Sequence, residues 1–206
     1  MSRRDDVARF ERRAGSYETG PLGHWHRLVA ERTAEIALQA VPAPRAVLDV
    51  GCGTGVLLRL LAERIRGQVP LLGVDPSPAM ITEGHAVRDL DARVGLVEGT
   101  AEDLPFPDDR FDLVVSSVSF DHWADQSGGL HEAARVLAPE GRLVLADLFA
   151  AWLGITGWVG RPRARTPAAA ERLLARARLR PVIWRRVYSL GPLPLVQAVV
   201  AASDLV

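Results

Sequence analysis

The sequence contains no lysine and only one cysteine, Cys52, among its 206 residues. The absence of lysine excludes a lysine amine as a general base or Schiff-base former. A single cysteine excludes an intrachain disulfide framework and a metal site built from several cysteines. A reducing, cytoplasmic location is therefore the default expectation.

Long apolar runs and an excess of one charge are lacking as well. No uninterrupted stretch of about 18 apolar residues occurs, so no membrane span is predicted. The charged N-terminus, MSRRDDVARF, has no apolar region of a signal peptide. The 25 basic and 25 acidic residues balance, which argues against a nucleic acid or an anionic membrane as the main partner.

Strands and helices alternate through most of the chain. Apolar runs predict strands at 46–50, 71–75, 93–98, 111–119 and 142–149. Amphipathic stretches predict helices at 56–65, after Ser77-Pro78, and at 128–137. Strands that are apolar on both faces are typical of a parallel sheet covered by helices on each side. We therefore predict an α/β, Rossmann-like fold.

The two ends of the chain depart from this alternation. Residues 7–40 are predicted to be helical, with a break around Gly15 to Gly23. After residue 149 the sequence predicts an irregular segment, a helix from Thr166 to about Arg178, and two final strands. Those strands, near 181–189 and 193–201, are joined by a turn so short that they must pair antiparallel.

These patterns predict one domain spanning residues 1–206, since the length suits a single core. Its parts are a helical N-terminal cap (1–44), a cofactor-binding core (45–149), and a C-terminal part (150–206). The C-terminal part comprises a lid segment, a helix and a terminal β-hairpin.

The stretch VLDVGCGTG (47–55) carries the strongest chemical signal. A glycine-rich turn between a strand and a helix exposes main-chain amides to a ligand. Its G-x-G-x-G spacing is one residue tighter than the dinucleotide fingerprint G-x-G-x-x-G. The charge of Asp49 repels a pyrophosphate by roughly 1 kcal/mol or more at ~4 Å, but attracts a cation. The loop is thus predicted to bind a nucleoside with a cationic tail and no phosphate, unless Asp49 only caps the turn.

Five motifs follow one another in an order that resembles class I S-adenosylmethionine-dependent methyltransferases. The closest likeness is to the small-molecule group that includes the ubiquinone and menaquinone biosynthesis enzymes. The motifs are DVGCGTG (49–55), GVD (73–75), EGTAEDLPF (98–106), FDLVVSS (111–117) and RVLAPEGRL (135–143). The resemblance covers about residues 45–148. It implies a seven-stranded sheet ending in an antiparallel strand, S-adenosylmethionine as cofactor, S-adenosylhomocysteine as product, and a small-molecule methyl acceptor.

The resemblance also implies which residues hold the cofactor. The loop residues Asp49, Gly51, Gly53 and Gly55, with Cys52 between them, match positions that cradle the methionine part. Asp75 matches the acid that holds both ribose hydroxyls.

Other matching positions lie around the adenine and the entrance. Pro76 and Met80 match the loop beside adenine, although Met80 fits a core role equally well. Ala101 and Glu102 match the adenine edge, but Thr100 stands where many relatives carry aspartate, so Glu102 fits solvent as well as ligand. Ser117 ends the fourth strand at the edge where open α/β sheets bind ligands. Tyr17 resembles the family's N-terminal tyrosine that closes over the cofactor.

His122, just past the fourth strand, is the candidate catalytic residue. It is predicted to act as general base if the acceptor is not already nucleophilic, or else to order the loop through hydrogen bonds. His24 and His26 are two residues apart and cannot share one helix face, so no metal site is predicted. The segment from Phe149 through Trp158 suits an acceptor-pocket wall or lid, which favours an apolar or aromatic acceptor, and it suits a surface loop packed on the core equally well.

Two rival functions remain open at this point. The first is a nicotinamide-dependent oxidoreductase on a similar sheet, against which the loop spacing and the charge of Asp49 argue. The second is a protein that binds S-adenosylmethionine without transferring its methyl group.

Overall fold

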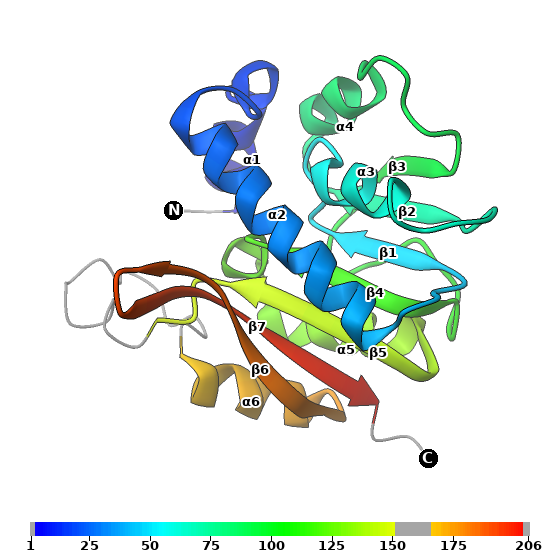
Figure 1. The fold of residues 1–206 in the computed structure, drawn as a ribbon, viewed down its shortest axis with the longest axis vertical. Helices are drawn as coiled ribbons and strands as arrows, with labels where there is room; N and C mark the ends of the chain where they lie inside the picture. Colours follow the sequence, from blue (N-terminus) through cyan, green and yellow to red (C-terminus); the bar gives the residue numbers. More distant parts are fainter. Residues whose placement is uncertain (1–2, 151–165, 204–206) are drawn as a thin grey trace.

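The computed structural model describes residues 3–150 and 166–203. Seven strands form one sheet in the order β3-β2-β1-β4-β5-β7-β6 (Figure 1). Strands β1 to β5 pair in parallel, whereas β7 pairs antiparallel with both β5 and β6. The strands are β1 (Val47–Val50), β2 (Leu71–Asp75), β3 (Val94–Glu98), β4 (Phe111–Ser117), β5 (Leu137–Asp147), β6 (Leu179–Leu190) and β7 (Leu193–Ser203). The predicted sheet with its terminal antiparallel hairpin is confirmed.

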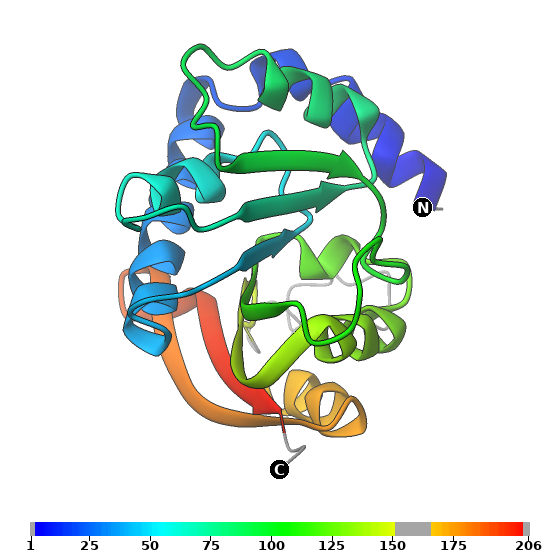
Figure 2. The ribbon, with the colours of Figure 1, turned by 90° about the vertical axis from the view of Figure 1, so that its right-hand side faces the viewer.

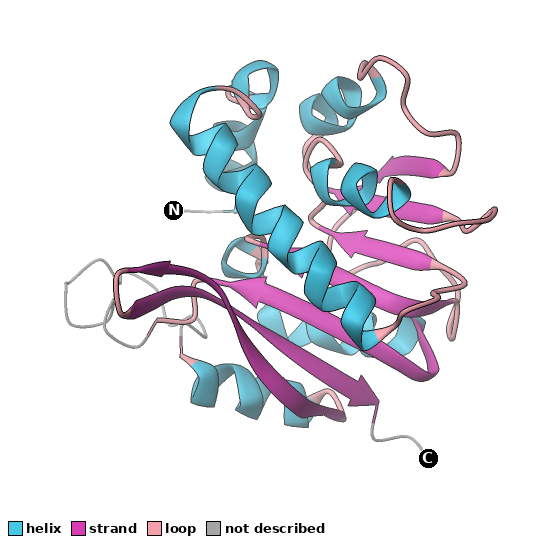
Figure 3. Ribbon diagram, viewed as in Figure 1, coloured by secondary structure: helices cyan, strands magenta, loops and turns pink. Residues whose placement is uncertain are grey.

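Helices cover both faces of this sheet (Figure 3). Val47 packs in the core beneath α2 and α3, whereas its neighbour Leu48 packs in the core beneath α5 and α6. Successive strand residues point to opposite faces, so a strand buried on both sides must be apolar throughout. The helices are α1 (Arg3–Glu11), α2 (Gly20–Ala40), α3 (Val56–Ala62), α4 (Pro78–His85), α5 (Gln126–Val136) and α6 (Pro167–Arg176), with 3₁₀ turns η1 (Ala14–Ser16) and η2 (Phe120–His122).

The N-terminal helices reach the edge of the sheet where the parallel strands end. Helix α1 contacts α4 and lies near the ends of β2 and β3 (Figure 2). The predicted break around Gly15 to Gly23 lies nearer the N-terminus, between the end of α1 at Glu11 and the start of α2 at Gly20. Gly23 lies inside this helix, and a Cβ there would come within 2.4 Å of the Glu18 carbonyl oxygen. This glycine therefore permits close packing and does not end a helix.

Two other boundaries differ from the sequence prediction. Helix α3 ends at Ala62 and not at Ile65, and the Arg93 guanidinium donates to the carbonyl oxygens of both residues at 2.7 Å. Strand β5 begins at Leu137 and not at Arg142. Its register against β4 shifts between those two residues, so the turn-forming Pro-Glu-Gly sequence between them is a bulge inside the strand.

Some predictions concern parts of the chain that the structure does not describe. The Trp-containing segment expected to form an acceptor-pocket wall lies mostly in residues 151–165, outside the described residues. The division into cap, core and C-terminal part stays a prediction. No helix among residues 3–150 and 166–203 is both long and apolar enough to cross a membrane.

Candidate functional site

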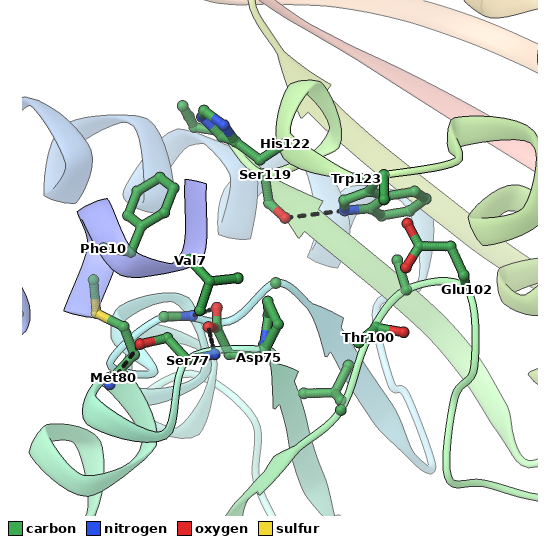
Figure 4. Close-up of a pocket in the computed structure, with 18 of the residues that line it drawn as sticks. Val7, Phe10, Asp75, Ser77, Met80, Thr100, Glu102, Ser119, His122 and Trp123 are labelled. Atoms are coloured by element: carbon green, nitrogen blue, oxygen red, sulfur yellow. Dashed lines mark hydrogen bonds between the residues drawn. The ribbon is translucent and has the colours of Figure 1, made fainter. Parts of the chain in front are cut away.

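The candidate site lies where β1, β2 and β4 end side by side at one edge of the sheet. Two cavities meet there, and both are lined by Tyr17, Gly51, Ser117 and Val118. The larger of the two encloses about 770 Å³, a volume that includes the open solvent at its mouth. Figure 4 shows this larger cavity, with residues from α1, from the end of β2 and from the loop after β4 pointing into it.

The glycine loop follows β1 and separates the two cavities. Gly51 has a φ of 77°, and a Cβ there would lie 1.7 Å from Ser119 Oγ, so only glycine fits. Gly55 has a φ of 79° and is the N-cap residue of α3, and a Cβ there would lie 3.3 Å from the Leu96 side chain. Gly55 is absent from the linings of both cavities. The structure therefore gives it a packing role, whereas Gly51 and Gly53 line the larger cavity.

Asp49 lies at the end of β1 in the lining of the smaller cavity and is 2% exposed. Its Oδ1 atom has no hydrogen-bond partner among the described residues. Burial, followed by the charge of Asp75, raises the pKa of Asp49 from 3.8 to about 8. The lining of the smaller cavity thus includes Cys52 and a buried carboxyl, one oxygen of which has no partner among the described residues.

Asp75 is the last residue of β2 and accepts two main-chain hydrogen bonds. Gly53 N–H donates to Oδ2 and Ser77 N–H donates to Oδ1, both at 2.9 Å. Burial raises the pKa of Asp75, and these two donors partly offset that effect. Each carboxylate oxygen keeps a second lone pair for a ligand hydroxyl.

The residues predicted beside adenine come together in the larger cavity. Pro76, Met80, Ala101 and Glu102 all line it. Met80 is 1% exposed, so it belongs to both the core and the cavity wall. Glu102 Oε1 accepts a hydrogen bond from Asp125 N–H at 3.0 Å. The structure thus gives Glu102 a protein contact that the sequence did not predict.

Tyr17 lies over the glycine loop, as expected for a residue that closes the site. Its ring comes within 3.6 Å of the position of a Gly53 Cβ, and it stacks on His26 at 4.6 Å between ring centroids. Burial raises the pKa of Tyr17, so its hydroxyl stays neutral at physiological pH.

Glu18, which sequence reasoning missed, fastens the N-terminal segment to this loop. Its Oε1 accepts from Thr54 Oγ1 at 2.7 Å, and its Oε2 accepts from Arg59 Nη2 at 2.6 Å. Arg59 also donates to the carbonyl oxygen of Thr54 at 2.7 Å. Nothing in the local pattern around Glu18 indicates a partner 36 residues or more along the chain.

His122 lies in η2, in the wall of the larger cavity. Its ring meets Phe10 of α1 edge to face, with 5.0 Å between ring centroids (Figure 4). Asp147, which is 2% exposed, holds the η2 turn in place. Its Oδ2 atom accepts a hydrogen bond from Asp121 N–H at 3.1 Å. Burial raises the pKa of Asp147 to about 6. Phe10 and Asp147 were not predicted, because both reach the site only through tertiary packing.

The chain matches a protein family described as "Methyltransferase domain" over residues 48–145. It is 40% identical over 126 residues to a demethylmenaquinone methyltransferase of Thermus thermophilus, covering 60% of this chain and 53% of that protein. It is 36% identical over 115 residues to 2-methyl-6-phytyl-1,4-hydroquinone methyltransferase 2 of Oryza sativa, covering 56% and 32%. The chain thus spans about half or less of the length of these relatives.

These matches confirm the predicted resemblance to class I S-adenosylmethionine-dependent methyltransferases. The chain has the fold of 1,6-didemethyltoxoflavin-N1-methyltransferase from Burkholderia thailandensis, a structure solved with 1,6-didemethyltoxoflavin and S-adenosylhomocysteine bound. That likeness has a TM-score of 0.70 at 20% identity and covers 99% of this chain and 92% of the other.

Proposed function

We propose that this protein transfers the methyl group of S-adenosylmethionine to a small aromatic molecule, with a quinol or another phenol as the first class to test. Two of its relatives are named for quinone and hydroquinone substrates. An apolar wall that includes Val7, Phe10 and Trp123 suits a planar apolar acceptor.

The observation that carries the proposal is the orphaned Oδ1 atom of buried Asp49. A buried polar atom without a partner costs about 1–3 kcal/mol, so its retention at a cavity needs a reason. The amino-acid end of S-adenosylmethionine carries an ammonium group, whose N–H donors match this acceptor. A dinucleotide would instead bring phosphates and no cation beside Asp49 and Asp75, so that either carboxyl could ionise only against repulsion from the phosphates.

The rest of the cavity fits the nucleoside part of the same cofactor. In the proposal, the free lone pairs of Asp75 accept from the ribose hydroxyls, while Gly53 and Ser77 hold its carboxylate in place. The apolar side chains of Met80 and Ala101 face the adenine ring. Glu102 is proposed to lie at the edge of the base.

His122 is the proposed general base, because it lies in the same cavity wall as the apolar side chains that suit the acceptor. When bound, S-adenosylmethionine supplies a methyl group already activated as a sulfonium. The protein must then position the acceptor and, for a phenol, remove the hydroxyl proton. A neutral imidazole beside Phe10 can take that proton.

Calorimetry with S-adenosylhomocysteine and with NADH tests the cofactor. We expect binding of the first and none of the second, and the reverse would refute the proposal. Transfer from radiolabelled S-adenosylmethionine to a panel of quinols, simple phenols and N-heterocycles then tests the acceptor class. Tight cofactor binding without transfer to any compound would favour the non-catalytic alternative.

Replacing His122 by alanine separates its two predicted roles. We expect turnover on a phenol to fall by about 10²–10⁴-fold, the usual contribution of a general base, with cofactor affinity unchanged. His131→Ala is the matched control, because His131 lies exposed on α5. Full activity of the His122→Ala variant would refute its role as base.

A further inference from the structure

The smaller cavity contains a second orphaned polar atom, Nδ1 of His26. Neither this atom nor Asp49 Oδ1 has a hydrogen-bond partner within the described part of the chain. Both residues line the same cavity. One of the two atoms is an acceptor on a carboxyl, and the other is an imidazole nitrogen that can carry a proton.

His26 is held firmly in this position. Its ring stacks on Tyr17 with an interplanar angle of 23°, and its centroid lies 5.2 Å from that of Trp25. A phenylalanine ring at this position could stack on Tyr17 equally well. Unlike histidine, it would bury no nitrogen that needs a hydrogen-bond partner. More than nine in ten buried polar groups in proteins are paired. The nitrogen therefore points to a partner that enters the cavity.

His26 is uncharged at neutral pH. Burial, followed by the positive charge of Arg13, lowers its pKa to about 4. A neutral ring does not repel an ammonium group held by Asp49 nearby. Its protonated nitrogen can still donate one hydrogen bond to an anion. Arg13 adds positive charge to this region, since its Cζ atom lies 6.0 Å from the centroid of the Tyr17 ring.

We propose that His26, through Nδ1–H, binds the carboxylate of the cofactor's amino-acid end, while Asp49 binds its ammonium group. This inference rests on the proposed function, because it assumes that S-adenosylmethionine occupies the site. A zwitterion needs one donor and one acceptor, and the smaller cavity offers one of each. His26 thereby selects a cofactor with an intact amino-acid carboxylate.

Three ligands that carry successively fewer groups of the amino-acid end test this assignment by calorimetry. S-Adenosylmethionine carries the carboxylate and the ammonium group, and its decarboxylated form lacks only the carboxylate. 5′-Methylthioadenosine is a thioether that lacks the whole amino-acid chain and the sulfonium charge. The variant His26→Phe keeps a stacking ring, and His26→Asn places an amide donor near the position of Nδ1. His24→Phe is the matched control, since His24 lies exposed on the same helix.

We expect His26→Phe to weaken S-adenosylmethionine roughly tenfold to a hundredfold, as for a lost hydrogen bond to a charged group. Its affinities for the other two ligands should stay within about twofold. His26→Asn should recover part of the loss, and His24→Phe should change nothing. Asp49→Asn should weaken both ligands that carry an ammonium group and spare 5′-methylthioadenosine.

Two results would overturn the assignment. An equal loss for all three ligands in His26→Phe would show that His26 only supports Tyr17 and the cavity wall. Unchanged affinity for S-adenosylmethionine in a folded His26→Phe variant would show that the nitrogen makes no contact. Failure of the unmodified protein to bind S-adenosylmethionine would instead refute the proposed function, and this inference with it.

Discussion

Replacing Asp49 by asparagine is expected to stabilise the ligand-free protein while weakening cofactor binding. Asp49 is fully buried, one of its oxygens has no hydrogen-bond partner in the part of the chain that the structure describes, and its pKa rises from 3.8 to about 8. Each pKa unit corresponds to about 1.4 kcal/mol. Ionising Asp49 in the fold therefore costs on the order of 5 kcal/mol more than ionising it in water. Asparagine has nearly the same shape and carries no charge.

The sign of the pH dependence follows from the raised pKa. Between pH 3.8 and about 8 the folded state keeps a proton on Asp49 that the unfolded state has released. Stability is therefore highest below this window and falls as pH rises through it. The Asp49→Asn variant has no carboxyl at this position and does not lose stability in this way. The difference in free energy of unfolding between the variant and the unmodified protein should therefore grow from pH 5 to pH 8 and then level off.

Urea denaturation at pH 5, 6.5, 8 and 9 measures this difference. The control is Asp89→Asn, because Asp89 is exposed and its φ of 57° is one that asparagine tolerates. The affinity for S-adenosylhomocysteine should fall at least tenfold in Asp49→Asn at pH 8. A variant that is no more stable than the unmodified protein at pH 8, or that binds with full affinity, would refute the reasoning.

Three further substitutions test neighbouring contacts. Asp75→Ala should weaken S-adenosylhomocysteine at least tenfold by calorimetry, since each charge-assisted hydrogen bond contributes about 1.5–3 kcal/mol; unchanged affinity would remove the ribose assignment. Gly51→Ala should lower the melting temperature and abolish binding, because its Cβ would lie 1.7 Å from Ser119 Oγ at a φ of 77°; a stable variant that binds would contradict that geometry. Glu18→Gln should lower the free energy of unfolding by under ~1 kcal/mol, since the lost ion pair with Arg59 is partly exposed. That small effect should shrink at high salt, and a salt-independent loss would point to the hydrogen bond with Thr54 instead.

The sheet and the centre of the site could be predicted because their signals are local. A strand buried on both faces must be apolar, so β1 and β4 stand out in the sequence. Gly51 has a positive φ of 77°, a backbone conformation that residues with a side chain rarely adopt, so a glycine is expected at this position. Asp49 is the last residue but one of β1 and Asp75 is the last of the parallel neighbour β2, so alternating strands and helices alone place both carboxyls at one edge.

The remaining contacts could not be predicted, because they join segments far apart in the sequence. Phe10 reaches His122 only because α1 packs against α4. Glu18 reaches Arg59 only because the segment before α2 crosses the glycine loop. Boundaries also depend on distant groups: α3 ends at Ala62, whose carbonyl oxygen accepts a hydrogen bond from Arg93, the residue before β3. Such contacts leave no period or motif in the local sequence.

The unpaired groups of the smaller cavity link cofactor binding to the stability of the fold. In the ligand-free protein, Asp49 Oδ1 and His26 Nδ1 are both buried without a partner within the described residues. A zwitterionic ligand that pairs both atoms removes these unfavourable terms from the folded state alone, because neither group is buried in the unfolded chain. Ligand at a hundred times its dissociation constant adds about 2.7 kcal/mol to the free energy of unfolding. 5′-Methylthioadenosine, which leaves both atoms unpaired, should therefore raise the melting temperature less than S-adenosylhomocysteine at equal concentration, and equal shifts would show that the amino-acid end contributes nothing to binding.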